Sequence, residues 1–430
     1  MNTREFFIKL RSLIDSCSLE NYMFLEIKNI GKIKNAKIEL RGITVLAGNN
    51  NTGKSTFGKV LFCVFNSFFD AENTIQKERH NDIESIISRF IPLQYRDRKS
   101  VKNITEKLLS EKDIENKDVT QYFLDEIPDL QVENSTLEPL LKRIEQSKNV
   151  SDEEIQKRII SHWFSGEFNN PITHINQPNV QGEILLIIRK KMIKVIVNAG
   201  ECVEFSDEVR IQHNAFYIDT PFLFDDIVQA SHLSYINHYQ HWDHLRKKLR
   251  YSTRPGNMVE EVVLKKKIDS VMQLLYSTVN GNFKEVKQDL GFQESGLNKP
   301  LHISKMSTGM KVFLIVKRLL ESGNIKEQDV LIFDEPEIHL HPEWQIVFAE
   351  MLVLLQRDFN LTILLTTHSP YFLNAIETFS KRHEVVNNCN YYFTTNEDGF
   401  CSIQDVTKDT SIIYDIMTKP FQQLENLRYE

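Results

Sequence analysis

The chain has 430 residues, a length that can hold two or three domains. Its 52 Lys and Arg residues against 59 Asp and Glu residues leave a net charge of −7, and 41% of the residues are hydrophobic, which is typical of a globular protein. No stretch approaches the roughly 20 apolar residues that a membrane-spanning helix needs. The five scattered cysteines include no CxxC pair, and the N-terminus lacks signal-peptide features. We therefore expect a cytoplasmic protein without disulfides, a zinc ribbon or a membrane partner.

The N-terminal part of the chain predicts one helix and three strands. Apolar residues at helical spacing predict an amphipathic helix over 3–16, in a segment 1–21 that could pack on the body of the protein or on a second subunit. Residues 23–30 and 36–40 predict two strands separated by a turn at Gly31. Residues 43–48 are apolar and β-branched, which predicts a third, buried strand.

That third strand leads directly into a phosphate-binding motif. The motif is Gly48-Asn49-Asn50-Asn51-Thr52-Gly53-Lys54-Ser55-Thr56, which matches G-x-x-x-x-G-K-[ST] and is followed by a helical pattern. Glycines in such a loop let backbone N–H groups turn inward around phosphates, and the start of the following helix adds its dipole. We expect Lys54 to reach the β- and γ-phosphates of ATP and the Ser55 hydroxyl to bind Mg²⁺.

The middle of the chain predicts a large insertion. Residues 73–180 are polar and helical without a sustained heptad, which favours a compact helical body over a long coiled coil. Residues 183–205 alternate like a hairpin or meander, and 214–219 predict another strand. A second helical stretch covers roughly 223–280. We therefore expect a mainly helical insertion over 73–300, with a β-hairpin near 183–219.

Three histidines in the second helical stretch, His238, His241 and His244, are spaced three apart. They share a helix face roughly and could hold a metal ion. Without a nearby cysteine or carboxylate motif, surface or packing roles are the more usual alternative.

Basic residues follow the histidines. They could grip the phosphates of DNA or RNA, and a solvated helix face is the alternative. The cluster consists of Arg246, Lys247, Lys248, Arg250 and Arg254, with Lys265, Lys266 and Lys267 further along.

A serine and a glycine stand before the long apolar helical pattern of residues 302–320. Ser307 suits the N-cap position, and the amides around it and Gly309 can receive an anion. An ordinary capped helix start is the alternative.

An apolar run, Val330 to Phe333, leads directly into Asp334 and Glu335. A short apolar run bounded by charge predicts a buried parallel strand whose carboxyl end opens on a site. There the first carboxylate can hold Mg²⁺ or its water, and the second can polarise the water that attacks the γ-phosphate. A strand that ends in a solvated acidic turn is the alternative.

The last predicted core strand, 361–370, carries His368 near its end. A histidine at the tip of a strand beside the acidic one can donate to a γ-phosphate. A closing hairpin, a short helix and a polar tail are expected after it.

Taken in chain order, these motifs resemble the ABC-type ATPase head of the SMC, RecF and overcoming-lysogenization-defect families. GNNNTGKST resembles the Walker A motif, MSTGMK the signature, LIFDEPE the Walker B motif and LLTTHSP the switch-histidine strand. The resemblance implies an α/β fold with a mixed β-sheet core and a P-loop, in which 22–72 and 301–430 form the head around the insertion. Thr308 and Lys311 depart from the transporter form of the signature. The glutamine of the family's Q-loop stays open between Gln212 and Gln229.

The resemblance also implies the cofactors ATP and Mg²⁺ and an assembly of two or more chains. In such heads ATP lies between Lys54 of one subunit and the signature of the other, here Ser307, Gly309 and Lys311. Glu335 and His368 are then the catalytic residues, and Ser55 and Asp334 bind the metal.

The wording around the Walker B motif is similar to stand-alone ATPases of two-gene anti-phage systems of the Septu type, with the PARIS type as second choice. In those systems the effector is a separate nuclease, of HNH or TOPRIM type respectively. We therefore expect an ATPase that acts as sensor and scaffold for a nuclease. The alternative is a RecF-like or SMC-like ATPase of DNA repair that binds DNA directly. A membrane-transporter subunit is disfavoured by the unusual signature and the long insertion.

Overall fold

The computed structural model describes residues 22–110, 116–130, 134–169, 172–173, 180–226, 239–250, 258–286 and 289–429. The chain forms two compact units: unit 1 comprises residues 1–66 and 160–430, and unit 2 comprises residues 67–159. The expected N-terminal helix over 3–16, Gln229, His238 and Arg254 lie outside the described residues.

A six-stranded sheet in the order β14-β13-β3-β12-β11-β7 forms the centre of unit 1. All neighbours pair in parallel except β14, which is antiparallel to β13. Strands β3, β7 and β11 are buried along almost their whole length, as expected for parallel strands that are covered on both faces. The strands are β3 (Ile43–Gly48), β7 (Ala215–Ile218), β11 (Val330–Asp334), β12 (Thr362–Thr367), β13 (Cys389–Glu397) and β14 (Phe400–Asp405).

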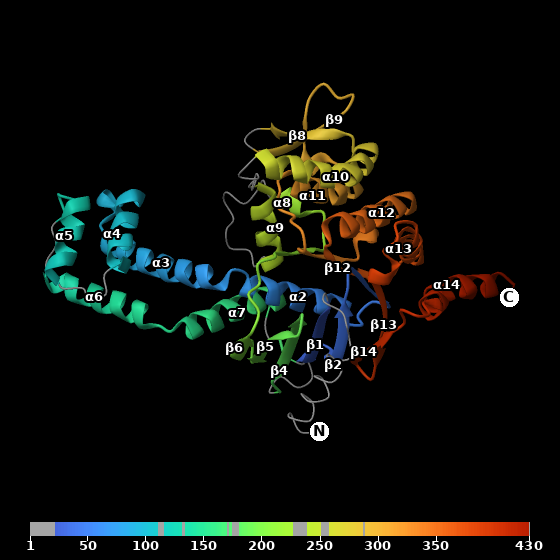
Figure 1. The fold of residues 1–430 in the computed structure, drawn as a ribbon, viewed down its shortest axis with the longest axis horizontal. Coiled ribbons are helices and arrows are strands. Elements are labelled where there is room, and N and C mark those ends of the chain that lie inside the picture. The colour runs from blue at the N-terminus through green and yellow to red at the C-terminus, as the bar shows by residue number, and fades with distance from the viewer. Residues whose placement is uncertain are drawn as a thin grey trace. The chain divides into compact units, whose positions relative to one another are not determined.

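A second, antiparallel sheet has the order β2-β1-β4-β5-β6 and is drawn beneath helix α2 in Figure 1. Its strands are β1 (Met23–Ile30), β2 (Ile33–Leu40), β4 (Gly182–Ile188), β5 (Lys191–Asn198) and β6 (Glu201–Asp207). A small third sheet contains β8 (Gly281–Val286), β9 (Asp289–Glu294) and β10 (Leu301–His302).

The strands between 182 and 218, which we expected within the insertion, pair with strands from outside it. Strand β4 pairs with β1, and β7 pairs with β11, so both are part of the sheets of unit 1. The compact helical body is accordingly limited to unit 2.

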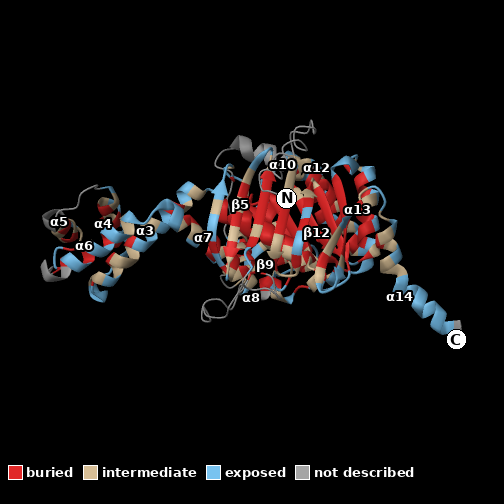
Figure 2. Cartoon of the chain, turned by 90° about the horizontal axis from the view of Figure 1, so that it is seen from below, coloured by how far each residue is buried: buried red, intermediate tan, exposed pale blue. Residues whose placement is uncertain are grey.

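The helices of unit 1 bury an aromatic cluster against the six-stranded sheet. Phe348 lies with its ring centroid 5.3 Å from Phe313 and 5.5 Å from Phe333, both in edge-to-face geometry. Figure 2 shows buried residues filling the sheets. The α-helices that lie wholly or partly in unit 1 are α2 (Lys54–Phe68), α7 (Asp152–Phe168), α8 (Leu223–Asp226), α9 (Gln240–Arg250), α10 (Met258–Thr278), α11 (Thr308–Glu321), α12 (Pro342–Phe359), α13 (Pro370–Arg382) and α14 (Ser411–Tyr429), with 3₁₀ turns at η2 (Ile303–Lys305), η3 (Pro336–His339) and η4 (Val386–Asn388).

Unit 2 is helical and has a small core of its own. Ile83 and Ile87 of α3, Ile104 of α4 and Phe123 of α5 are all fully buried in one cluster. The elements are α3 (Ala71–Phe90), η1 (Leu93–Tyr95), α4 (Arg98–Ser110), α5 (Asn116–Glu126) and α6 (Asn134–Asn149).

The C-terminal tail differs from the short helix and polar tail expected from the sequence. Helix α14 continues to Tyr429 and exposes Phe421, Leu424 and Leu427. Leu, Gln, Glu and Arg in this stretch are good helix formers, so the helix persists without burial. In the described part of the chain, no helix is long and apolar enough to cross a membrane.

Candidate nucleotide-binding site

The carboxyl ends of β3, β12 and β11 lie at one edge of the central sheet, because these strands run parallel and adjacent. The P-loop follows β3, His368 follows β12, and Asp334 ends β11. Motifs that are far apart in the sequence therefore meet at one place, which is where ligands bind in open α/β sheets.

The P-loop forms a cradle suited to an anion, and its lysine donates to two carbonyl oxygens of the loop. Lys54 is 4% exposed, and its ammonium donates to the carbonyl oxygens of Gly48 at 3.0 Å and Asn49 at 2.8 Å. In the described structure, no hydrogen bond uses the backbone N–H groups of residues 50–53, which are the donors that would face phosphates. Gly53 adopts φ +92°, a conformation that favours glycine. The loop therefore fits the phosphates of a nucleotide.

A threonine pair fixes the loop to the neighbouring strand. The Thr52 hydroxyl donates to the carbonyl of Asn49 at 2.9 Å and lies 2.8 Å from the Thr394 hydroxyl of β13. A Cβ added at Gly48 would lie 2.3 Å from the carbonyl oxygen of Thr394. Glycine is therefore required at position 48 for the close approach of the two strands.

Glu335 lies between the P-loop lysine and the switch histidine. Its Oε1 is 3.5 Å from Lys54 Nζ and 3.6 Å from His368 Nδ1. Pairing with His368 lowers the pKa of Glu335, and the charge of Lys54 acts in the same direction against the effect of burial. The carboxylate is therefore ionised at neutral pH and can accept a proton. Glu335 also has φ +51°, a strained conformation of the kind found at functional sites.

The two oxygens of Asp334 are each oriented by a hydroxyl group from a flanking strand. Thr366 Oγ1 of β12 donates to Oδ1 at 2.5 Å, and the Tyr217 hydroxyl of β7 donates to Oδ2 at 2.7 Å. Ser55 lies in the first turn of α2, directly after Lys54. Carboxylate and hydroxyl oxygens are the ligands that Mg²⁺ prefers, so this pair fits a magnesium ion chemically.

Sequence reasoning missed a third carboxylate, Glu337, which is 3% exposed. Its Oε1 accepts hydrogen bonds from Thr367 Oγ1 at 2.5 Å and from the backbone N–H of His368 at 3.0 Å. Burial raises the pKa of Glu337, and no residue that the structure describes forms a hydrogen bond with its buried Oε2. The residue lies only two positions after Glu335, but its partners come from β12, 30 positions later for Thr367. Only the fold shows that Glu337 holds the switch strand.

His368 lies close to two carboxylates, those of Glu335 and Glu337. Its Nδ1 lies 3.6 Å from Glu335 Oε1 and 3.8 Å from Glu337 Oε1. Pairing with Glu335 raises the pKa of His368, and Glu337 contributes in the same direction, while burial opposes both. The imidazolium therefore persists to a higher pH than in an isolated histidine, which suits a donor to phosphate.

The signature residues lie at the start of α11. Ser307 is the N-cap, and its hydroxyl accepts from the Met310 N–H at 3.4 Å. Gly309 is closely packed, because a Cβ there would lie 3.1 Å from both the His339 carbonyl and the Trp344 ring. For Ser307 and Gly309, these described contacts are with residues 310–344 and none is with the P-loop of the same chain.

Lys311, which the resemblance places at the nucleotide, is held by its own chain in this structure. It is 3% exposed, and its ammonium donates to the Ser304 carbonyl at 3.0 Å. The apolar face of α11 buries the stem of the side chain, so the charge is used to hold η2 in place.

The histidine cluster does not form a metal site among the described residues, which contain no group of three or more metal-ligating side chains. His241 is buried and pairs with Glu167, its Nδ1 lying 2.8 Å from both carboxylate oxygens. His244 packs against Phe62 and Phe216, and burial lowers its pKa to about 3. Packing roles therefore describe these two residues.

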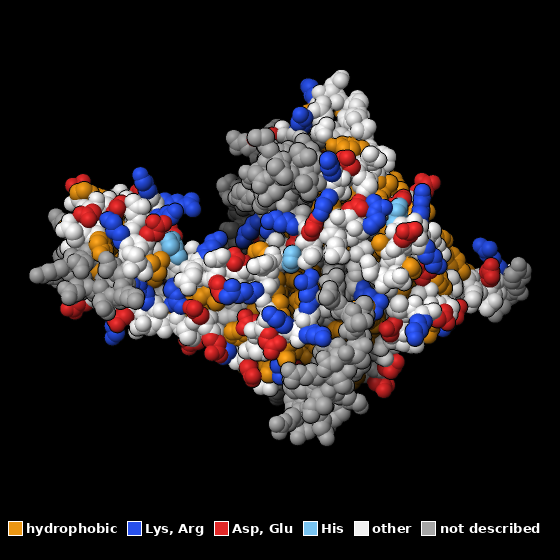
Figure 3. Space-filling model, viewed as in Figure 1, with side chains coloured by type: hydrophobic (Ala, Val, Ile, Leu, Met, Phe, Trp, Pro, Cys, Tyr) orange, Lys and Arg blue, Asp and Glu red, His pale blue; other side chains and the backbone are white. Residues whose placement is uncertain are grey.

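The basic cluster on α9 does not form one continuous charged face. Arg246 is 7% exposed and pairs with Asp243, and Lys248 donates to Asn214 Oδ1 at 3.2 Å. Lys267 forms an ion pair with Glu327. On the face drawn in Figure 3, Lys and Arg side chains lie interspersed with Asp and Glu side chains.

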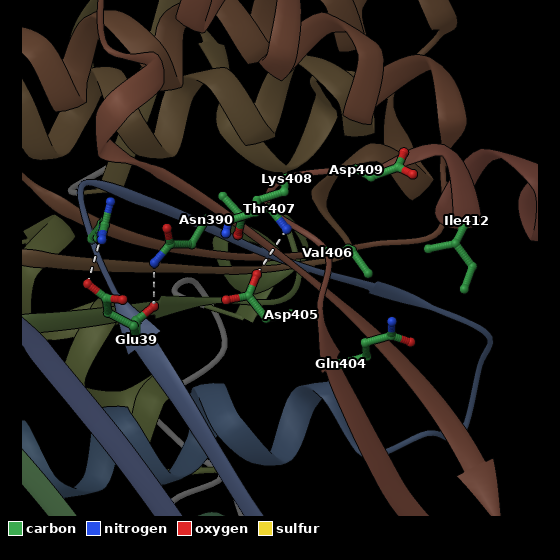
Figure 4. A pocket seen from close by; sticks show the side chains of 10 residues that line it. Glu39, Asn390, Gln404, Asp405, Val406, Thr407, Lys408, Asp409 and Ile412 are labelled. Atoms are coloured by element: carbon green, nitrogen blue, oxygen red, sulfur yellow. Dashed lines mark hydrogen bonds and ion pairs between the residues drawn. The ribbon is translucent and has the colours of Figure 1, made fainter. Parts of the chain in front are cut away.

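Two cavities lie at the opposite edge of the sheet. One, of about 610 Å³, is lined by Gln212 together with Gly42 and Thr362, at the amino ends of β3 and β12. Gln212 therefore lies at the edge of the sheet opposite to the P-loop. The other, of about 660 Å³ and drawn in Figure 4, includes Glu39 and Asp405 in its wall and none of the P-loop residues.

A histidine titration tests the charge arrangement. We expect the pKa of His368 in the nucleotide-free protein to lie above the ordinary value of about 6.5, and Glu337→Gln to lower it, because a nearby negative charge is removed. The stability that this pairing contributes is fully present below about pH 6.5 and is lost as the pH rises through the folded-state pKa of His368. Nuclear magnetic resonance of labelled histidine rings, with a His368→Gln spectrum for assignment, measures this value directly.

The matched control is Glu343→Gln on α12, a substitution of an exposed glutamate, which should leave the titration of His368 unchanged. A pKa of His368 at or below 6.5, or one that Glu337→Gln does not change, would contradict the account.

Comparisons with known proteins agree with this geometry. The family model described as "AAA ATPase domain" matches residues 23–373. The chain is 33% identical over 107 residues to the Septu protein PtuA of Bacillus thuringiensis, a match that covers 22% of this chain and 26% of that protein. The chain thus aligns with about a quarter of the length of this relative.

Two solved structures are similar at 12% identity. One is the SMC head domain from Thermotoga maritima, with a TM-score of 0.38 over 89% of this chain and 98% of that chain. The other is the Smc head domain with an extended coiled coil bound to the C-terminal domain of ScpA derived from Pyrococcus furiosus, with a TM-score of 0.41 over 92% of this chain and 99% of that chain. Because the family match spans most of the chain, the protein belongs to the AAA ATPase domain family and is an ATPase.

Proposed function

We propose that this ATPase closes around ATP as a two-fold dimer and, through that closure, regulates a separate effector nuclease in anti-phage defence. The observation that carries the proposal is the position of Ser307, an anion-receptive helix N-cap whose described contacts are away from the P-loop of its own chain. A single chain has one cradle and one signature, so a complete site needs a second chain.

At the cradle, we assign the phosphates to the backbone N–H groups of residues 50–53 and to Lys54. Phosphate oxygens would take the place of the carbonyl oxygens that now accept from the lysine. Ser55 and Asp334 would hold Mg²⁺, which neutralises charge on the β- and γ-phosphates when bound.

Glu335 serves as the base for the attacking water. Its carboxylate stays ionised because His368 and Lys54 lower its pKa. It is positioned by its backbone N–H, which donates to Thr366 Oγ1 at 3.0 Å. His368, charged through the same pairing, serves as a donor to the γ-phosphate.

The dimer follows from the geometry of the two half-sites. If Ser307 and Gly309 of one chain face the P-loop of the other, the reverse contact is made as well, which gives a two-fold, isologous interface. Binding energy at two nucleotides then favours the closed state, and hydrolysis releases it.

The role in defence rests on the similarity to the Septu protein PtuA and on the resemblance of the Walker B wording to stand-alone ATPases of such systems. The effector would be a nuclease of HNH type, encoded separately. Direct DNA binding as in RecF receives less support, because Arg246 and Lys248 of α9 are turned toward the protein.

Glu335→Gln tests the role of the base. The amide keeps the size of the side chain but cannot accept the proton, so we expect ATP to bind while turnover falls by a factor of roughly 100 to 10,000. Light scattering coupled to gel filtration should show a dimer with ATP and Mg²⁺. Glu343→Gln is the matched control and should behave as the unmodified protein. Turnover within twofold of the unmodified protein would remove Glu335 from the reaction.

A mixing experiment tests whether the sites are shared. Lys54→Ala and Ser307→Arg each break both sites of a homodimer, whereas the heterodimer has one site damaged twice and one site intact. We therefore expect ATPase activity to return on mixing, to at most about half of the unmodified activity per dimer. Mixing two separately prepared batches of Lys54→Ala is the control.

Subunit exchange is followed by fluorescence energy transfer between labelled chains. Exchange without any recovery of activity would contradict independent shared sites. Normal hydrolysis by Ser307→Arg alone would show that this serine is only a helix cap.

A further inference from the structure

Tyr217 is a buried tyrosine whose only polar atom points at the acidic strand of the site. It is 1% exposed, and its hydroxyl donates to Asp334 Oδ2 at 2.7 Å. In the parallel pair of β7 and β11, Tyr217 lies opposite Ile332, two positions before Asp334. The side chain therefore reaches along the strand toward the carboxyl edge.

Together with Thr366, Tyr217 fixes the carboxylate plane of Asp334. Thr366 Oγ1 donates to the other oxygen at 2.5 Å from the opposite flanking strand. Each oxygen thus accepts one hydrogen bond from the protein and keeps a lone pair for a metal ion or its water. Hydrogen bonds to ionised acceptors are the strong ones, so this arrangement resists rotation of the carboxylate.

The ring of Tyr217 also fills the space between the acidic strand and the P-loop helix. A Cβ added at Gly58 of α2 would lie 2.7 Å from Tyr217 Cε2 and 2.8 Å from Ile332 Cγ2. Helix α2 can approach β7 and β11 this closely only because residue 58 is glycine. The same tyrosine therefore touches both of the elements that hold the nucleotide.

An acid–imidazole–acid cluster also packs against the ring. His241 is 1% exposed, and its ring centroid lies 4.6 Å from that of Tyr217 in edge-to-face geometry. Its Nδ1 is 2.8 Å from both oxygens of Glu167, and its Nε2 is 3.1 Å from Asp219 Oδ2. The imidazole is thus held on both nitrogens by buried or half-buried carboxylates.

The cluster is anchored to the P-loop helix as well. Lys59, next to Gly58, lies 3.4 Å from Glu167 Oε1 and donates to the Glu167 carbonyl at 3.3 Å. Separating the partners of a buried ion pair leaves a buried charge uncompensated, which is costly. These contacts therefore fix the positions of Glu167 and His241.

We infer that Tyr217 is a positioning residue for metal binding: its hydroxyl orients Asp334, and His241, clamped by Glu167 and Asp219, holds its ring in place. The inference rests on the proposed role of Asp334 as a magnesium ligand. Tyr217 and His241 support the proposed metal ligand from outside the four sequence motifs. Residues of this kind orient a metal ligand and contribute to metal affinity without touching the metal.

The test is the Mg²⁺ dependence of nucleotide binding, measured by calorimetry with a non-hydrolysable ATP analogue at a series of Mg²⁺ concentrations. Tyr217→Phe removes one oxygen atom and keeps the ring, so the fold should be retained. We expect the Mg²⁺ concentration for half-maximal enhancement of binding to rise roughly tenfold, with affinity in the absence of Mg²⁺ unchanged.

The matched control is Tyr414→Phe, which removes another phenol that donates to a carboxylate, that of Glu377 at 3.1 Å, between α14 and α13. It should leave the Mg²⁺ dependence unchanged. A half-maximal Mg²⁺ concentration for Tyr217→Phe within twofold of the unmodified protein would overturn the inference.

His241→Gln tests whether His241 holds the ring of Tyr217 in place. We expect a smaller rise in the same direction, and the double variant with Tyr217→Phe should be no worse than Tyr217→Phe alone, because both act through one hydroxyl. Fully additive effects would overturn the role of His241. If nucleotide binding by the unmodified protein were independent of Mg²⁺, the assignment of Asp334 would fail instead, which separates the two claims.

Discussion

The parallel pairing of β3, β12, β11 and β7 is the constraint on which the rest of the structure depends. Parallel strands in register end at the same edge, so residues from four distant parts of the chain are brought together without long loops. Tyr217, Asp334 and Thr366 can meet only because β11 lies between β7 and β12.

The edge so formed is dominated by charge that is only partly balanced within the chain. Lys54 is nearly buried and faces two carbonyl oxygens and Glu335, which compensate one positive charge. His368 shares Glu335 with the lysine and draws further on Glu337. A phosphate group would add negative charge among these cations, so nucleotide binding and the protonation of His368 are expected to be linked.

Local patterns predicted the parts of the site that lie within a few residues of one another. The P-loop, the acidic strand end and Ser307 as an N-cap each depend on a short stretch, and the α/β fold with a mixed sheet expected from their order is confirmed. The contacts of Glu337 and Tyr217 could not be found in this way, because their partners are 30 and 117 positions distant. Their positions follow from strand order, which a single sequence does not reveal.

The same limit applies to the predicted insertion and to single residues such as Gln212 and Lys311, because a sequence does not indicate which strands become neighbours. Strands β4 and β7 have apolar patterns that predict strands but do not indicate their neighbours. Gln212 has the residue type of a Q-loop glutamine, but it lies at the amino ends of β3 and β12. Lys311 lies at a position of the signature motif, and its side chain is buried on α11.

Nucleotide binding by Lys54→Ala tests the central claim that this edge of the sheet is the ATP site. Calorimetry with ATP and Mg²⁺ compares the variant with the unmodified protein and with Lys408→Ala, a control in the cavity of Figure 4 at the opposite edge. We expect Lys54→Ala to lose nucleotide binding and to retain its circular dichroism spectrum, because the lysine supplies charge to phosphate rather than core packing. Normal affinity in a folded Lys54→Ala protein would contradict it.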